Sequence, residues 1–215
     1  VPHCPGAFYL DERPAFTFYP LSHAGVYYVQ EASSMYLAKA LEEHLGFPLA
    51  SFGAYASPHS DSRLSDTPST SPHYALDLCA APGGKSTLLR SLLPDDWWLV
   101  SNEPMPKRAQ VLAENMAKWG LLHTAVTNHD PAELGALRPP FDLIVADVPC
   151  SGEGMFRKDT DSTGEWSVAN VQLCAARSRR IIHDIWDALR PGGLLVYSTC
   201  TYNLEEDEEH VRYFV

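Results

Sequence analysis

The sequence lacks the features that mark membrane proteins, secreted disulfide-rich proteins and zinc-binding domains. It has no apolar run close to 18 residues and no charged-then-apolar leader, so no segment is expected to cross or target a membrane. Its five cysteines are an odd number without a CxxC pair. They therefore argue against a disulfide framework or a metal cluster and favour a reducing cytoplasm. The absence of an initiator Met leads us to expect a fragment of a longer protein.

Basic residues are also scarce, with 16 lysines and arginines against 27 aspartates and glutamates and a net charge of −11. A protein that holds nucleic acid mainly through its phosphates needs a basic surface, so the composition argues against a broad footprint of this kind. Part of the acidic excess lies in residues 205–209, whereas basic residues gather at 157–158 and 177–180. A local basic path is therefore compatible with the acidic average.

Short apolar runs alternate with longer amphipathic ones along most of the chain. Strands are expected at 74–79, 97–102, 124–127, 141–146 and 194–199, and helices at 31–45, 85–93, 106–119 and from about 171 to 189. Gly46 and Gly120 are positioned to end two of the helices, and Pro191 to end the last. This alternation predicts a doubly wound α/β domain with a mostly parallel sheet, whose ligands gather at the carboxyl ends of the strands.

The pattern divides the chain into three parts. Residues 1–56 are expected to form a helical lead-in packed on the main domain, and residues 73–215 are expected to form that domain. Residues 57–72, rich in Ser, Pro, Thr and Asp, are expected to be a polar flexible linker.

The segment CAAPGGKST lies at the first expected strand-to-helix turn, where glycines allow close approach of a ligand and the helix amino terminus favours anionic groups. It matches the phosphate-loop pattern except that Cys79 replaces the first glycine, so a nucleotide triphosphatase is one alternative and a plain tight turn is another. Glu103, at the end of the second strand, has the position of an acid that binds a ribose diol. S-adenosylmethionine, a nucleoside without phosphate, suits both features.

Two cysteines follow the fourth and fifth strands, Cys150 in DVPCSG and Cys200 in STCTY. Because adjacent strands lie about 4.8 Å apart, both thiols are expected at the sheet edge that carries the glycine turn. A single cysteine is more often a packed core thiol, the interpretation kept for Cys79 and Cys174. Two converging thiols indicate covalent chemistry, since a thiolate added to carbon 6 of cytosine activates carbon 5 for methylation. Asp147 is the nearest carboxylate in sequence that can stabilise charge at N3.

Together, five sequence blocks closely resemble the RNA cytosine-5 methyltransferases of the Nop/Sun type, especially the bacterial RsmF-like branch that modifies small-subunit ribosomal RNA. The blocks are HAGVYYVQEASSMYLAKAL (23–41), LDLCAAPGGKST (76–87), SNEPMPKRAQVLAENMAKWG (101–120), FDLIVADVPCSGEGMFRKD (141–159) and GGLLVYSTCTYNLEEDE (192–208). The resemblance covers nearly the whole chain. It implies a Rossmann-like methyltransferase that uses S-adenosylmethionine and acts on RNA.

The resemblance also implies roles for individual residues. Those expected around the cofactor are Cys79, Ala80, Ala81, Pro82, Gly83, Gly84 and Lys85 at its methionine end, Glu103 at its ribose, Asp130 near its adenine, and Asp147 between cofactor and target base. It makes Cys200 the nucleophile that attacks carbon 6 and Cys150 the thiol that helps release the product.

Two other classes of protein have some of these features. DNA cytosine methyltransferases use their PC cysteine as nucleophile, but they carry a different glycine motif and an ENV triplet that this chain lacks. A noncatalytic module that binds cofactor or RNA stays open. Relatives in this branch often carry further RNA-binding segments, and none is visible here, so this piece alone is expected to bind RNA weakly.

Overall fold

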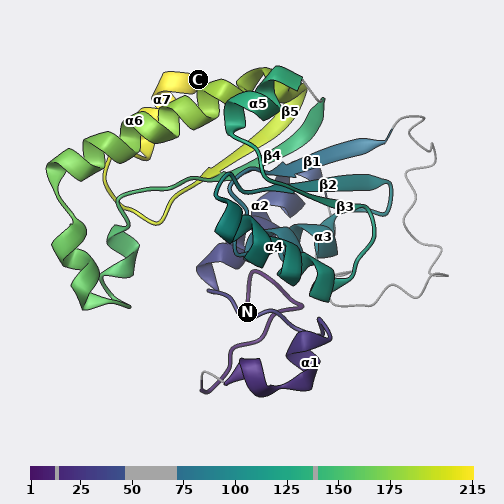
Figure 1. The fold of residues 1–215 in the computed structure, drawn as a ribbon. Helices are drawn as coiled ribbons and strands as arrows, with labels where there is room; N and C mark the ends of the chain where they lie inside the picture. The colour runs from purple at the N-terminus through teal and green to yellow at the C-terminus, as the bar shows by residue number, and fades with distance from the viewer. Residues whose placement is uncertain (13–14, 47–71, 138–139) are drawn as a thin grey trace.

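The computed structural model describes residues 1–12, 15–46, 72–137 and 140–215. The expected linker at 57–72 lies outside this part of the chain except for Pro72. Five parallel strands form one sheet in the order β3-β2-β1-β4-β5 (Figure 1). The strands are β1 (His73–Asp77), β2 (Trp97–Asn102), β3 (Thr124–Thr127), β4 (Phe141–Asp147) and β5 (Leu189–Ser198). The predicted Rossmann-like α/β fold with a parallel sheet is confirmed.

Helices cover both faces of the sheet (Figure 1). The α-helices are α1 (Pro20–His23), α2 (Tyr36–Leu45), α3 (Gly84–Leu92), α4 (Pro106–Trp119), α5 (Pro131–Leu137), α6 (Val168–Ile185) and α7 (Glu208–Phe214). Short 3-10 helices lie at Phe16–Phe18, Ser33–Met35, Glu153–Met155, Thr160–Glu165 and Trp186–Ala188. Gly46 and Gly120 follow α2 and α4 in the left-handed conformation and end them as predicted. None of the helices described is long and apolar enough to cross a membrane.

The two faces of the sheet carry two separate hydrophobic clusters. Helices α2, α3 and α4 lie on one face, and α5, α6 and α7 lie on the other (Figure 1). The first cluster includes Cys4 and Leu41 from the amino-terminal part of the chain, packed with Leu88 and Leu89 of α3. The second joins Ile144 of β4 to the buried face of α6. The amino-terminal segment is therefore part of the core that supports the first strand-to-helix turn.

The carboxyl end of the long helix and the start of β5 differ from the prediction. Helix α6 ends at Ile185, a 3-10 turn follows, and Leu189 opens β5 instead of closing the helix. Pro191 suits extended backbone, and it is tolerated because β5 is an outer strand of the sheet. A register shift absorbs the extra residues, since Phe141 pairs with Leu189 but Leu143 pairs with Leu194.

Two smaller differences concern element bounds. β1 ends at Asp77 instead of residue 79, because the chain already turns there toward α3. Helix α5 was not predicted, since its seven residues include Gly135 and are too few to show a clear helical period.

Arg90 is a charged side chain in the interior of the first cluster. It is 4% exposed and donates hydrogen bonds to the carbonyl oxygens of Trp97 and Leu93, each at 2.7 Å, and of Pro94 at 2.8 Å. A single guanidinium therefore joins the end of α3 to the start of β2. Burial lowers the pKa of Arg90 from its ordinary value.

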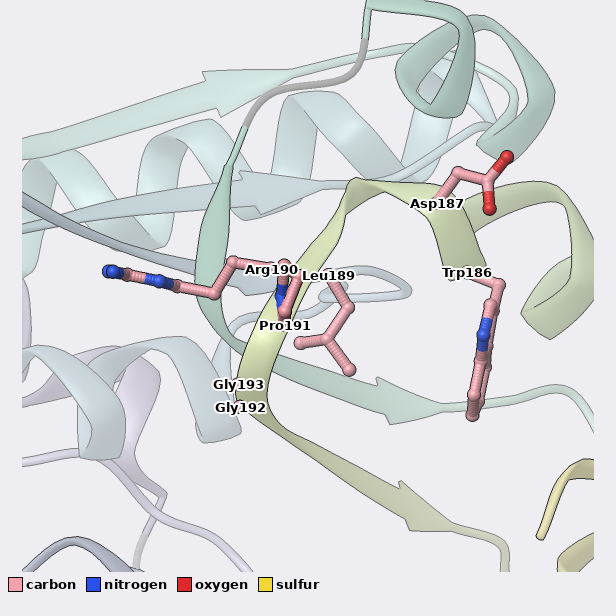
Figure 2. A pocket seen from close by; sticks show the side chains of 7 residues that line it. All are labelled: Trp186, Asp187, Leu189, Arg190, Pro191, Gly192 and Gly193. Carbon is pink, nitrogen blue, oxygen red and sulfur yellow. The ribbon is translucent and has the colours of Figure 1, made fainter.

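A shallow pocket of about 590 Å³ lies at the amino end of β5 and is lined by Trp186, Asp187, Leu189, Arg190, Pro191, Gly192 and Gly193 (Figure 2). In Figure 2 the Arg190 side chain extends away from Trp186 and Asp187, and it pairs with Asp142 of β4. Ligands of sheets of this kind bind at the carboxyl ends of the strands, so this pocket is at the wrong end for the predicted chemistry.

Candidate active site

Cys150 and Cys200 meet beyond the carboxyl ends of β4 and β5. These strands pair in parallel up to Asp147 and Ser198, and a short loop then carries each cysteine away from the sheet. The two sulfur atoms are 3.2 Å apart, and the backbone N–H of Cys200 donates to the sulfur of Cys150, also at 3.2 Å. Cys200 is exposed, whereas Cys150 is half-buried. Two residues far apart in sequence thus form one dithiol at the edge of the sheet.

The two thiols of this pair differ in acidity. The hydrogen bond from Cys150 lowers the pKa of Cys200 to about 7, and the positive charge of Lys85 acts in the same direction against burial and Asp147. The same hydrogen bond, together with burial, raises the pKa of Cys150. Burial and the nearby carboxylates raise the pKa of Cys79 to about 12. Cys200 is therefore the thiol that ionises near neutral pH, and Cys79 stays protonated.

This difference predicts the pH dependence of thiol alkylation. The thiolate is the reactive form, so the rate of Cys200 labelling by iodoacetamide should rise with pH and reach half its maximum near pH 7. In Cys150→Ala the donor of the stabilising hydrogen bond is lost, and the midpoint should move up by about one pH unit or more. Rates are read from mass spectra of the peptide that contains residue 200, with Cys174→Ala as the control variant. An unchanged midpoint in Cys150→Ala would contradict this account.

Asp147, the last residue of β4, connects the thiols to the glycine turn. One carboxylate oxygen accepts from Lys85 Nζ at 2.7 Å, and the other accepts from Ser198 Oγ at 2.7 Å. Lys85 lies in the first turn of α3 and Ser198 ends β5. The carboxylate therefore has a fixed orientation, with a positive charge on one side and the cysteine loops on the other.

Seven residues predicted to bind cofactor lie in the turn between β1 and α3 and in the first turn of α3. Ala80, Ala81 and Gly83 are buried, Cys79, Gly84 and Lys85 are half-buried, and Pro82 is exposed. Gly83 has a φ of 115°, which side chains other than that of glycine rarely adopt. Helix α4 holds the turn in place, since Arg108 donates to the carbonyl of Ala81 at 2.9 Å and Asn115 to that of Pro82 at 2.8 Å.

Glu103 and Asp130 lie at the same edge of the sheet, after β2 and β3. Glu103 is 1% exposed, and one of its oxygens accepts from the N–H of Met105 at 3.1 Å. The other oxygen is buried without a hydrogen bond, 3.5 Å from the guanidinium of Arg108. Asp130 caps α5 by accepting from the N–H of Ala132 at 3.1 Å. Glu103 thus has a free acceptor, whereas one oxygen of Asp130 is already used.

Several residues near the site were not identified from the sequence. Gln30 and Tyr28 of the amino-terminal segment lie over the glycine turn, because a Cβ added to Gly84 would come within 3.0 Å and 3.3 Å of their side chains. Glu153 holds the loop after Cys200, accepting from the N–H of Tyr202 at 2.8 Å and from Trp166 Nε1 at 2.9 Å. Within the described ranges, no group of three or more His, Cys, Asp or Glu side chains could hold a metal ion.

Known proteins are similar to this chain in sequence and in fold. Ribosomal RNA small subunit methyltransferase F of Cronobacter sakazakii is 36% identical over 100% of this chain and 41% of its own length. The protein of the same name from Vibrio cholerae is 35% identical over 97% of this chain and 40% of its own. The chain thus spans about two fifths of these relatives. NSun6 from Pyrococcus horikoshii, solved with the S-adenosylmethionine analogue SFG, is 26% identical with a TM-score of 0.72, covering 94% of this chain and 45% of that one.

The family comparison covers the whole sheet and every residue of the predicted site. The matching model is described as 16S rRNA methyltransferase RsmB/F, and it aligns with residues 67–215. With a parallel sheet in this strand order and relatives at 36% identity, the chain belongs to the RsmB/F family of 16S rRNA methyltransferases.

Proposed function

We propose that this chain is the catalytic part of an enzyme that methylates carbon 5 of a cytosine in RNA, with S-adenosylmethionine as methyl donor and Cys200 as nucleophile. The substrate proposed is small-subunit ribosomal RNA, in line with the names of the relatives. The observation that carries the proposal is the dithiol, in which an acidic Cys200 lies 3.2 Å from Cys150 beside a glycine turn. A dithiol that must stay reduced to act is compatible with the reducing cytoplasm, which is the location proposed for this protein.

The cofactor is S-adenosylmethionine, and the residues at the carboxyl edge of the sheet fit it. The buried Glu103 oxygen that faces Arg108 accepts no hydrogen bond, so it is an acceptor suited to a ribose hydroxyl, and a buried acceptor without a hydrogen bond is costly unless a ligand supplies a donor. The turn from Cys79 to Lys85 would hold the methionine end, and Asp130 would lie near the adenine. The cofactor supplies a methyl group on a sulfonium sulfur.

In the proposed mechanism, the Cys200 thiolate adds to carbon 6 of the cytosine and forms a carbon–sulfur bond. The electron pair displaced from the ring raises the negative charge on N3. The ammonium group of Lys85, which donates to Asp147 at 2.7 Å, supplies a proton that the Asp147 carboxylate passes to N3, and this proton neutralises the charge. The ring is now an enamine, which makes carbon 5 nucleophilic enough to take the methyl group.

Release of the product reverses the addition. A general base removes the proton from carbon 5, the carbon–sulfur bond breaks, and the sulfur of Cys200 leaves as a thiolate. Cys150 is proposed to assist this step. A thiol 3.2 Å from the leaving sulfur is near enough to donate a hydrogen bond to it, which stabilises the negative charge that develops.

Thermal unfolding separates the proposed cofactor from the alternative of a nucleotide triphosphatase. At 100 times its Kd, S-adenosylmethionine should stabilise the folded chain by about 2.7 kcal/mol and raise its Tm, whereas ATP with magnesium should not. In Glu103→Gln an amide donor replaces one of the carboxylate acceptors, so affinity for the cofactor should fall about tenfold or more. Glu114→Gln, an exposed change on α4, is the matched control. A Tm that rises with ATP and magnesium but not with S-adenosylmethionine would favour the triphosphatase.

Cofactor binding does not distinguish an enzyme from a noncatalytic module, so a transfer assay is required. Tritium from the labelled methyl group should appear in small-subunit ribosomal RNA, and bisulfite mapping should locate it at one cytosine. Because the relatives are more than twice as long and this chain is acidic, the assay should use the full-length protein at low salt. Cofactor binding without any transfer to RNA would favour the noncatalytic module.

A further inference from the structure

Glu206 is a fully buried carboxylate in the segment that links β5 to α7, and the mechanism above does not use it. One oxygen accepts from the backbone N–H of Ser151 at 2.9 Å. The other accepts from Ser151 Oγ at 2.5 Å and from Asn203 Nδ2 at 2.8 Å. Burying a carboxylate is costly unless its oxygens are well satisfied, and here neutral donors on two different loops satisfy them.

The donors to Glu206 flank the two cysteines. Ser151 directly follows Cys150, and Asn203 is three residues after Cys200. The two loops also meet directly, because Ser151 Oγ lies 3.0 Å from Thr201 Oγ1 and accepts from Asn203 Nδ2 at 3.2 Å.

We propose that Glu206 is a positioning residue that clamps the loop after β4 to the loop after β5 and thereby keeps the sulfurs of Cys150 and Cys200 in contact. The significance of this clamp for catalysis rests on the proposed function, but the clamp itself does not. Glu206 thus has a structural role within an acidic run, residues 205–209, whose composition resembles that of a solvated surface segment.

The clamp is needed because the strand ladder stops before the cysteines. The register of β4 and β5 ends at Asp147 and Ser198. Two isolated backbone bonds follow, from Val148 N–H to the carbonyl of Ser198 at 3.1 Å and from Gly154 N–H to the carbonyl of Cys200 at 2.8 Å. Apart from these bonds the loops are irregular and have no continuous ladder to hold them together. Glu206 is itself fixed, since Tyr197 donates from its hydroxyl to the Glu206 carbonyl at 2.7 Å.

A trivalent arsenical tests the clamp without RNA or cofactor. Phenylarsine oxide bridges two close thiols, which give up their protons as its oxygen leaves as water. The intact protein should bind one equivalent tightly, and Cys200→Ala should define the level without a pair. Glu206→Ala should weaken binding about tenfold or more, the size expected when hydrogen bonds to a buried carboxylate are lost. Glu206→Gln keeps one acceptor oxygen, so its affinity for the arsenical should lie between those of Glu206→Ala and the intact protein.

Two further variants make the result decisive. Glu205→Ala removes the exposed acid one residue earlier and should bind the arsenical like the intact protein. If Glu206→Ala does not fold, Asn203→Ala removes the bonds that Asn203 makes to Ser151 and to the Glu206 carboxylate, while leaving the bonds between Glu206 and Ser151. Unchanged arsenical affinity in either folded variant would overturn the clamp, even if methyl transfer is confirmed. Conversely, weaker binding supports the clamp even if the proposed function is wrong.

If both the clamp and the proposed function hold, steady-state kinetics should show a specific pattern. Glu206→Ala should lower kcat about tenfold or more, because the thiols that act on the base are no longer held together. The KM for S-adenosylmethionine should stay the same, since the Glu206 carboxylate bonds to Ser151 and Asn203 and not to the glycine turn or Glu103. A general loss of structure would instead change both constants.

Discussion

Cys200→Ala is expected to reduce methyl transfer on the order of 10⁴-fold or more, because loss of a covalent nucleophile leaves only binding and electrostatic effects. Cys150→Ala is expected to behave differently. Its nucleophile is intact, so the adduct with RNA should form but break down slowly and accumulate. A band of protein cross-linked to RNA that survives denaturing electrophoresis would report it.

These two variants check each other. Cys174→Ala is the control, since this thiol is buried in α6, where it donates to Asn170 and not to the dithiol, and its removal should leave transfer intact. The double variant lacking both Cys150 and Cys200 should give no adduct. A fully active Cys200→Ala protein would refute the assignment of the nucleophile, and a stable adduct in Cys200→Ala but not in Cys150→Ala would reverse the two roles.

Arg90→Met is expected to give the largest loss of stability, about 3 kcal/mol, because buried carbonyl oxygens lose the donors that satisfy them. For a chain of this size the corresponding drop in Tm is about 6–12 °C. The methionine retains most of the apolar packing of the arginine stem, so the loss reports mainly on the hydrogen bonds to Trp97, Leu93 and Pro94. Denaturant unfolding followed by circular dichroism measures it.

The matched control is Arg108→Met on α4, a half-exposed arginine whose loss should cost much less stability. Arg108 holds the carbonyl of Ala81, so this variant should instead weaken cofactor binding. If Arg90→Met unfolds at the same denaturant concentration as the original chain, the three hydrogen bonds make no net contribution to the free energy of unfolding.

The strand-end positions of the site could be predicted from the sequence because short apolar runs were followed by the residues that carry chemistry. Cys150 and Cys200 each come directly after such a run, and a parallel sheet brings the ends of neighbouring strands together. Glu103 was found in the same way. Gly120 and Gly46 ended helices at the predicted residues because a left-handed residue after a helix is a local requirement.

The parts that could not be predicted depend on contacts between distant segments. Glu206 lies in an acidic run that has the composition of a solvated surface, and only its contact with Ser151 shows that it is buried. The available signal was that a hydroxyl residue follows each cysteine, which suggests a shared acceptor. Gln30 lies over the glycine turn only because the amino-terminal segment packs on α3, and Leu189 joins β5 because Phe141 offers it a partner.

The contact between two sulfurs that are 50 residues apart has a consequence for the chemistry of the unfolded chain. Without the sheet, their mean separation would be on the order of 40 Å, and Cys200 would be an ordinary thiol of high pKa. Its acidity is therefore acquired on folding and is no property of the local sequence. A newly made or damaged molecule has only the low reactivity of an ordinary thiol at this position until β4 and β5 have paired.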